Sequence, residues 1–230
     1  MANRRPKEAK DEMKRRARRI VTVLRKRYPG ATTALHFTSP HQLLVATVLA
    51  AQCTDKKVNE VTAKLFRKYQ SPQDFAKARQ ATLEKEIRPA GFFRNKARSI
   101  IGLSQDIVKD HDGVVPDNLE DLVKLGGVGR KTANVVLAGA FGKPGIVVDT
   151  HMIRVAHRLE FSANHDPTKI EFDLMDILPR RVWGDFSFMV VLHGREICKA
   201  RNPLCNICTI ERYCPSSILK AKDRRLPRRS

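Results

Sequence analysis

LGGVGRKTANVVL, residues 125–137, contains three glycines within four positions, then two cations, then apolar residues at helical spacing. Gly126, Gly127 and Gly129 can adopt positive φ and expose their N–H groups, and a helix start adds the positive end of its dipole. The stretch therefore predicts an anion site. Apolar residues at helical spacing in 117–125 predict a short helix upstream, so the unit is helix, glycine hairpin, helix. Backbone N–H groups and helix N-termini are among the groups that hold nucleic-acid phosphates without reading bases.

Two better-known glycine motifs do not fit this stretch. A P-loop needs glycine directly before the lysine, and that position is Arg130. A dinucleotide-binding loop needs a third glycine where Thr132 stands, and a strand before it, which the sequence does not predict. For the bare GVG sequence, an ordinary connection between two helices is the alternative.

Charge points to an anionic partner. The 230 residues carry 44 Lys and Arg against 24 Asp and Glu, a net charge of +20, which is typical of proteins that bind nucleic acid and, second, anionic membranes. Residues 1–27 hold +9 and residues 220–230 hold +5, which leaves about +6 for the 192 residues between. We expect these tails to attract the partner over distance and the body to supply specificity. Alternatively, the tails are solvated ends that aid solubility.

No signal peptide or membrane span is predicted. The basic start is followed by a charged amphipathic pattern, and the most apolar stretch, residues 43–51, has nine residues, about half of a span. An intracellular, cytoplasmic and nucleoid-associated soluble protein is expected.

Apolar spacing is helical almost everywhere. One stripe runs from Met13 to Tyr28 and ends at Pro29-Gly30, and helix stops are expected at Gly91 and Gly113. The only strand-like run is the short IVV at 146–148, so the class is all-α with about ten short helices. The stretch 141–145, FGKPG, predicts a hinge or domain boundary. Capping residues mark further helix starts at Ser39-Pro40, Thr54-Asp55, Ser71-Pro72 and Asp166-Pro167.

Four of the five cysteines lie within seventeen residues, at Cys198, Cys205, Cys208 and Cys214. In a reducing compartment such a cluster favours a metal site over disulfides. Four thiolates bind zinc or a [4Fe–4S] cluster, and this compact set with only one close pair favours the iron–sulfur cluster. Cys53 stands alone and is expected to be a small buried residue.

Together these stretches resemble the helix-hairpin-helix superfamily of DNA glycosylases, and most closely the endonuclease III family. The resemblance covers about residues 20 to 215 and depends on six motifs in the family's order as well as on the cysteine spacing. The motifs are LAAQCTD (49–55), GFFRNKA (91–97), LGGVGRKTANVVL (125–137), VDTHMIRV (148–155), LHGREIC (192–198) and the cysteine cluster itself. Several motifs in register are far more specific than any one of them.

The resemblance implies a two-domain all-α fold with the active site in the cleft between the domains. Residues 33–143 would form a six-helix barrel domain that contains the helix-hairpin-helix. Residues 144–230 would form the iron–sulfur cluster domain with a basic C-terminal tail, joined by the basic tail and helix of residues 1–32. The four cysteines match the family's ligands to a [4Fe–4S] cluster, and a monomer is expected.

The resemblance matches Lys131 to the family's nucleophilic lysine and Asp149 to its catalytic aspartate. A neutral amine that attacks C1′ of a deoxyribose expels the base, and the iminium it leaves permits strand nicking by β-elimination. Because only about one lysine amine in a thousand is neutral near pH 7.4, we expect desolvation, Arg130 and the helix N-terminus to lower the pKa of Lys131. Asp149 would take a proton or stabilise charge on the sugar. Alternatively Asp149 caps the helix over 151–159, for which Thr150 is an equal candidate, and His151 is expected to be structural.

Other matches concern DNA contacts. Gln52 would fill the gap left by an extruded base and Phe92 would wedge from the other side, although ordinary packing is the alternative for Phe92. The chain departs from the family pattern, which commonly has Ser at Ala50, a leucine-type wedge at Phe92 and Pro at Gly126. Phosphate contacts are predicted for Gly127, Gly129 and Arg130, and for Lys199 and Arg201 in the loop between the first two ligand cysteines.

These matches imply a bifunctional DNA glycosylase and AP lyase that removes oxidised pyrimidines from duplex DNA and nicks 3′ of the abasic site. Its partner would be double-stranded DNA containing damaged pyrimidines or abasic sites. One alternative is a catalytically silent helix-hairpin-helix DNA-binding protein. Another is an adenine-type monofunctional glycosylase, a group that lacks this lysine and usually carries a further C-terminal domain.

Overall fold

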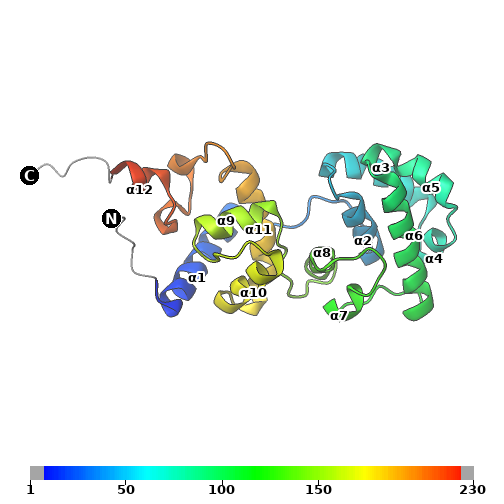
Figure 1. Cartoon of the computed structure of the whole chain (residues 1–230), viewed down its shortest axis with the longest axis horizontal. Coiled ribbons are helices and arrows are strands. Elements are labelled where there is room, and N and C mark those ends of the chain that lie inside the picture. The colour runs from blue at the N-terminus through cyan, green and yellow to red at the C-terminus, as the bar shows by residue number, and fades with distance from the viewer. Residues whose placement is uncertain (1–7, 224–230) are drawn as a thin grey trace, which may run out of the picture. The chain divides into compact units, whose positions relative to one another are not determined.

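The structure, a computed structural model, describes residues 8–223 (Figure 1). As predicted, it is all-α, and no strand occurs within those residues. The chain divides into two compact units, Thr33–Gly145 and the pair of segments Met1–Thr32 and Ile146–Ser230. The predicted seam at 141–145 thus lies directly before Ile146, at which the chain returns to the unit that contains Met1–Thr32.

The unit Thr33–Gly145 centres on the buried helix α2 (Pro40–Leu49), which packs against α3, α6 and α8 (Figure 1). α2 is apolar on every side, as its sequence predicts, and buries Leu43, Leu44 and Leu49 completely. Helix α6 also packs against α4 and α5. The remaining elements of this unit are α3 (Asp55–Lys68), α4 (Pro72–Ala76), α5 (Gln80–Ile87), the 3-10 helix η1 (Arg88–Ala90), α6 (Phe93–Asp110), α7 (Leu119–Leu122) and α8 (Arg130–Ala140).

Side-chain caps begin these helices at the predicted positions. Ser39 Oγ accepts a hydrogen bond from the N–H of Gln42 at 3.2 Å, and Ser71 and Asp74 form a reciprocal capping box. Helix α2 ends at Leu49, two residues before the end of the apolar stretch 43–51, because the chain turns there and passes through a left-handed residue at 52, with φ of 54°.

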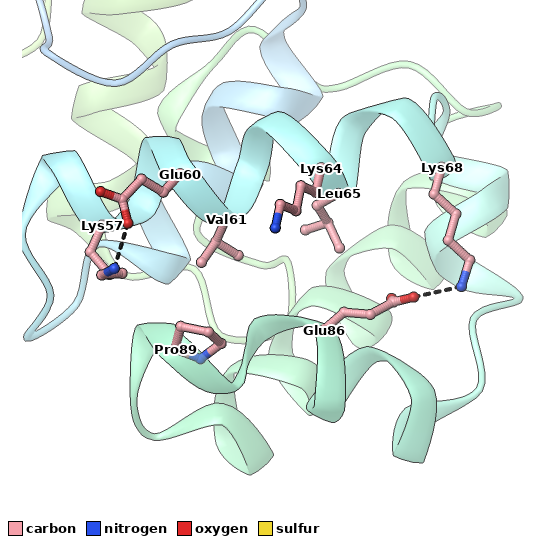
Figure 2. A pocket seen from close by; sticks show the side chains of 8 residues that line it. All are labelled: Lys57, Glu60, Val61, Lys64, Leu65, Lys68, Glu86 and Pro89. Atoms are coloured by element: carbon pink, nitrogen blue, oxygen red, sulfur yellow. Dashed lines mark hydrogen bonds and ion pairs between the residues drawn. The ribbon is translucent and has the colours of Figure 1, made fainter.

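A groove of about 340 Å³ lies between α3 and the α5–η1 segment (Figure 2). Val61 and Leu65 of α3 face Pro89 across it. Charged side chains surround these apolar residues, with ion pairs from Lys57 to Glu60 and from Lys68 to Glu86. None of the predicted site residues lines this groove, so it is separate from the candidate site.

The other unit packs α1 against α10 and α11, and α9 against the same two helices. The predicted stripe of α1 is buried here at Ala17, Ile20, Val21 and Leu24, against residues of α9, α10 and α11. The elements are α1 (Lys10–Arg27), α9 (Thr150–Arg158), α10 (Pro167–Ile177), η2 (Arg180–Val182), α11 (Trp183–Glu196), η3 (Cys205–Ile207), η4 (Glu211–Tyr213) and α12 (Ile218–Asp223).

Two further predictions concern the charged tails and membrane spans. Residues 1–7 and 224–230, which hold much of the predicted tail charge, lie outside the described residues. Among residues 8–223, no helix has both the length and the apolar character that crossing a membrane requires.

Candidate functional site

The predicted glycine hairpin joins α7 to α8. Leu125 and Val128 are buried and hold the turn in the core. Of the three glycines only Gly127 has a positive φ, 77°, and a Cβ at that position would lie 2.6 Å from Ser99 Oγ. Position 127 therefore requires glycine both for its backbone conformation and for its close approach to α6.

The N–H groups of the hairpin divide into satisfied and open ones. Gly126 N–H donates to Asp106 Oδ2 at 2.7 Å, so it is not available to a ligand. The N–H groups of Gly127 and Gly129 make no hydrogen bond within the described residues, and both glycines are exposed. Helix α8 has no capping side chain and no acidic residue in its first turn. The hairpin thus leaves the N–H groups of Gly127 and Gly129 open beside the start of α8, an arrangement that favours anions.

Lys131 is the second residue of α8, and its side chain is exposed. The desolvation that was expected for this amine is therefore not provided by the described residues. Arg130, which precedes it, is half-buried. Two cations at a helix N-terminus oppose the helix dipole, so a bound anion would stabilise this end of α8.

Asp149 is the N-cap of α9, and its Oδ1 accepts a hydrogen bond from the N–H of Met152 at 2.8 Å. The capping alternative is thus its local structural role, and Thr150 is the first helical residue rather than the cap. Within residues 8–223 the second carboxylate oxygen makes no hydrogen bond, so capping leaves it available for chemistry. His151 Nδ1 lies 3.1 Å from Arg154 Nη2. Lys131 belongs to the unit Thr33–Gly145 and Asp149 to the other unit.

Gln52 and Phe92 are both exposed and both left-handed, with φ of 54° and 49°. Phe92 leaves 62% of its surface accessible, which rules out the alternative that it packs in the core. Non-glycine residues take this backbone region at a cost, and they cluster at functional sites. The two side chains therefore project from turns of the same unit, one after α2 and one before α6.

The four predicted ligand cysteines line one cavity, whose other walls include Val155, Arg158 and His193. All four are half-buried. Burial raises the pKa of Cys208 to about 11 and also raises the pKa of Cys214, and the neighbouring sulfurs add to both effects. In the described part of the chain, no group of three or more His, Cys, Asp or Glu side chains is arranged to hold a metal ion.

A buried histidine that was not predicted as a site residue lies beside this cavity. His193 Nε2 is 3.7 Å from Cys208 Sγ. Burial, with a smaller effect of the Arg27 charge, lowers the pKa of His193 to about 4, so the ring is neutral near pH 7. The sequence signal was the HG pair inside LHGREIC, where a small residue accompanies a histidine on a buried helix face.

Two arginines of α9, also not predicted, hold the loop that follows Cys198. Arg158 donates to Cys198 Sγ at 3.1 Å and to the carbonyl oxygen of Lys199 at 2.8 Å, and Arg154 donates to the carbonyl oxygen of Cys198 at 2.9 Å. The spacing of four residues places both on one face of α9, which is the signal that could have identified them. The side chains of Lys199 and Arg201 are exposed on this supported loop.

Comparisons with known proteins agree with this arrangement. The family model described as "HhH-GPD superfamily base excision DNA repair protein" matches residues 45–180. An endonuclease III of Synechocystis sp. is 48% identical over 205 residues, which cover 89% of this chain and 94% of the relative. A solved non-covalent endonuclease III–DNA complex matches with a TM-score of 0.84 at 40% identity, over 91% of this chain and 98% of that chain. A trapped endonuclease III–DNA covalent intermediate gives the same TM-score and identity over 90% and 98%. The chain therefore belongs to the HhH-GPD superfamily of base excision DNA repair proteins, and within it to the endonuclease III family.

Proposed function

We propose that this protein is a bifunctional DNA glycosylase and AP lyase, which removes oxidised pyrimidines from duplex DNA and nicks the strand 3′ of the resulting abasic site. The observation that carries the proposal is the open anion site at Gly127 and Gly129 with an exposed lysine on the adjoining helical turn. Endonuclease III has been solved both in a non-covalent DNA complex and as a covalent intermediate with DNA. A phosphate site that presents an amine to the sugar accounts for both kinds of complex.

The chemistry assigned to Lys131 proceeds through a Schiff base. Its neutral Nζ attacks C1′ of the damaged nucleotide, the bond from C1′ to the base breaks, and the base leaves with a proton. A proton transferred to O4′, which protonated Asp149 can supply, opens the sugar ring and gives an iminium between Nζ and C1′, with a hydroxyl at C4′. Loss of a C2′ proton breaks the C3′–O bond and releases the 3′-phosphate, and water hydrolyses the iminium to regenerate the amine.

Lys131 must lose a proton before it attacks. Since the side chain is exposed in the protein alone, we assign its desolvation to the bound DNA, which would cover the hairpin. Asp149 is the proposed base, acting through the carboxylate oxygen that the α9 cap does not use. The same charge would stabilise positive charge on the sugar as the base departs.

Gln52 and Phe92 are proposed to enter the DNA stack when the damaged base is extruded. An extruded base leaves a gap, and side chains that already project from the protein can fill it. Their left-handed backbones and exposure support this role. Lys199 and Arg201 would contact the DNA backbone from the loop that Arg154 and Arg158 support.

A [4Fe–4S] cluster held by Cys198, Cys205, Cys208 and Cys214 is proposed as the cofactor. The donor set fits in its chemistry, because all four half-buried thiols line one cavity and thiolates are the usual ligands of such clusters. When bound, the cluster would cross-link the C-terminal loops without entering the reaction. Purified protein is expected to be brown, with broad absorbance near 400 nm and about four irons per chain. A colourless protein with stoichiometric zinc would contradict this assignment.

Two alternatives are less well supported. A silent DNA-binding protein would use the same glycine hairpin but would not need an exposed lysine at the start of α8. An adenine-type glycosylase lacks this lysine. The proposal also places the protein with its substrate, at the nucleoid of the cytoplasm.

The test compares Lys131→Ala with Lys64→Ala, an exposed lysine of α3 outside the site. Each protein is incubated with an abasic-site oligonucleotide and borohydride, which reduces a Schiff base to a stable adduct. The unsubstituted protein and Lys64→Ala are expected to form the adduct and nick the strand. Lys131→Ala is expected to form none while still binding DNA, measured by fluorescence anisotropy. Undiminished trapping by Lys131→Ala would remove this lysine from the mechanism.

A further inference from the structure

Lys96 is a buried lysine in the first turns of α6, with 5% of its surface exposed. It forms no ion pair within the described residues. Its Nζ instead donates to two backbone carbonyl oxygens, those of Leu49 and Ala90, each at 2.8 Å. Burial lowers the pKa of Lys96. Because a buried ammonium without a counter-ion is costly, these two hydrogen bonds are what hold it in place.

The two carbonyl groups belong to the turns that carry Gln52 and Phe92. Leu49 is the last residue of α2, three residues before Gln52, and Ala90 is the last residue of η1, two residues before Phe92. Carbonyl groups at helix ends lack partners within the helix, so one ammonium satisfies both ends and ties them together. After each of these two carbonyl groups, the backbone passes into a left-handed residue whose side chain is exposed, Gln52 in one segment and Phe92 in the other.

We propose that Lys96 is a positioning residue that sets the spacing between Gln52 and Phe92, so that both side chains enter the DNA stack together. This inference rests on the proposed function. Extrusion of a paired base requires unstacking and unpairing, which cost a few kcal/mol and fall when the base is already unpaired. The turns that carry Gln52 and Phe92 are already held by Lys96 when the base is extruded. Without that lysine, the two turns would have to become ordered on the DNA, at a cost in conformational entropy.

The test uses Lys96→Met, which keeps the length of the side chain and removes the donors, and Lys96→Arg, which keeps donors. Lys64→Met is the matched control on the same unit. Single-turnover excision is measured at saturating protein on two duplexes, one with 5-hydroxycytosine paired to guanine and one with the same base unpaired in a one-nucleotide bulge. Thermal unfolding of each variant is followed in parallel.

Lys96→Met is expected to slow excision of the paired base by roughly tenfold to a hundredfold, since small misplacements of positioning groups have effects of that size. Excision of the unpaired base is expected to slow by less than about threefold, because that base costs less to extrude. Lys96→Arg is expected to recover most of the rate on the paired substrate, and Lys64→Met to leave both rates unchanged. An equal loss on both substrates, or no loss on either, would overturn the proposal.

A second measurement does not depend on catalysis. In the Lys131→Ala background, a 2-aminopurine beside the lesion is expected to brighten on binding as the stack opens, and adding Lys96→Met is expected to reduce that signal at saturation. An unchanged signal contradicts the role of Lys96. If Lys96→Met does not fold, the paired-to-unpaired rate ratio of Lys96→Gln decides in the same way. Failure of the proposed function is distinguishable, because the unsubstituted protein would then excise neither base.

Discussion

Within the hairpin, single residues decide which backbone groups face a ligand. Asp106 accepts a hydrogen bond from the N–H of Gly126, and Ser99 packs directly against Gly127. A proline at 126, as the family pattern has it, would lack the N–H that Asp106 accepts. The hydrogen bond anchors the turn to α6 through a side chain, whereas a proline would restrict the backbone.

Replacing Gly127 with alanine should destabilise the protein by about 1–3 kcal/mol, because a Cβ is strained at positive φ and would also meet the side chain of Ser99. Urea denaturation measures the change. Gly102→Ala is the control, since Gly102 lies within α6 where an added Cβ would meet no neighbouring group within 4 Å, and alanine should stabilise that helix by up to about 1 kcal/mol. Equal effects of the two substitutions would show that the conformation of Gly127 is not required.

At the scale of elements, α9 connects several parts of the proposed site. Asp149 caps its first turn, and Arg154 and Arg158 on its later turns hold the backbone after Cys198. One helix thus positions both the proposed base and the loop that carries Lys199. Asp149 both caps α9 and is the proposed base. A substitution that preserves the cap but cannot accept a proton separates these two roles.

Asp149→Asn should keep the cap, because asparagine caps helices about as well as aspartate, and should change stability by less than about 0.5 kcal/mol. Its rate of base excision should fall by roughly 10²- to 10⁴-fold, because the amide cannot accept a proton. Asp149→Ala should lose the rate and also about 1 kcal/mol of stability. Single-turnover excision and urea denaturation give the two quantities. Full activity of Asp149→Asn would contradict the proposed role as base.

Helix ends and the class of fold could be predicted because their causes are local. Ser39, Ser71 and Gly113 act through their own backbone or the next turn, and the sequence shows them directly. The exposure of Lys131 and the internal hydrogen bond of Gly126 could not be predicted, since they depend on how α8 and α6 approach in space. The same holds for Lys96, whose partners lie 47 and 6 residues away.

For the whole molecule, most of the net positive charge lies outside the segment that holds the proposed site residues. The proposed catalytic and ligand residues all lie between residues 52 and 214, whereas residues 1–27 and 220–230 hold +14 of the net +20. Contacts of Lys and Arg with phosphate release counter-ions and make affinity depend on salt, without reading sequence or lesion. The tails should therefore affect how tightly DNA is bound more than how fast a bound lesion is excised.

Replacing Arg224, Arg225, Arg228 and Arg229 with glutamine tests this separation. The slope of log affinity against log salt concentration should become shallower by up to about 3–4 units, because each lost phosphate contact accounts for about 0.9. The single-turnover excision rate at saturating protein should stay unchanged, since none of the four belongs to the proposed site. Lysine at the same four positions preserves the charge and should restore the slope. If the glutamine and lysine variants give the same slope as the unsubstituted chain, these arginines are only solvated ends, and the body alone supplies the attraction.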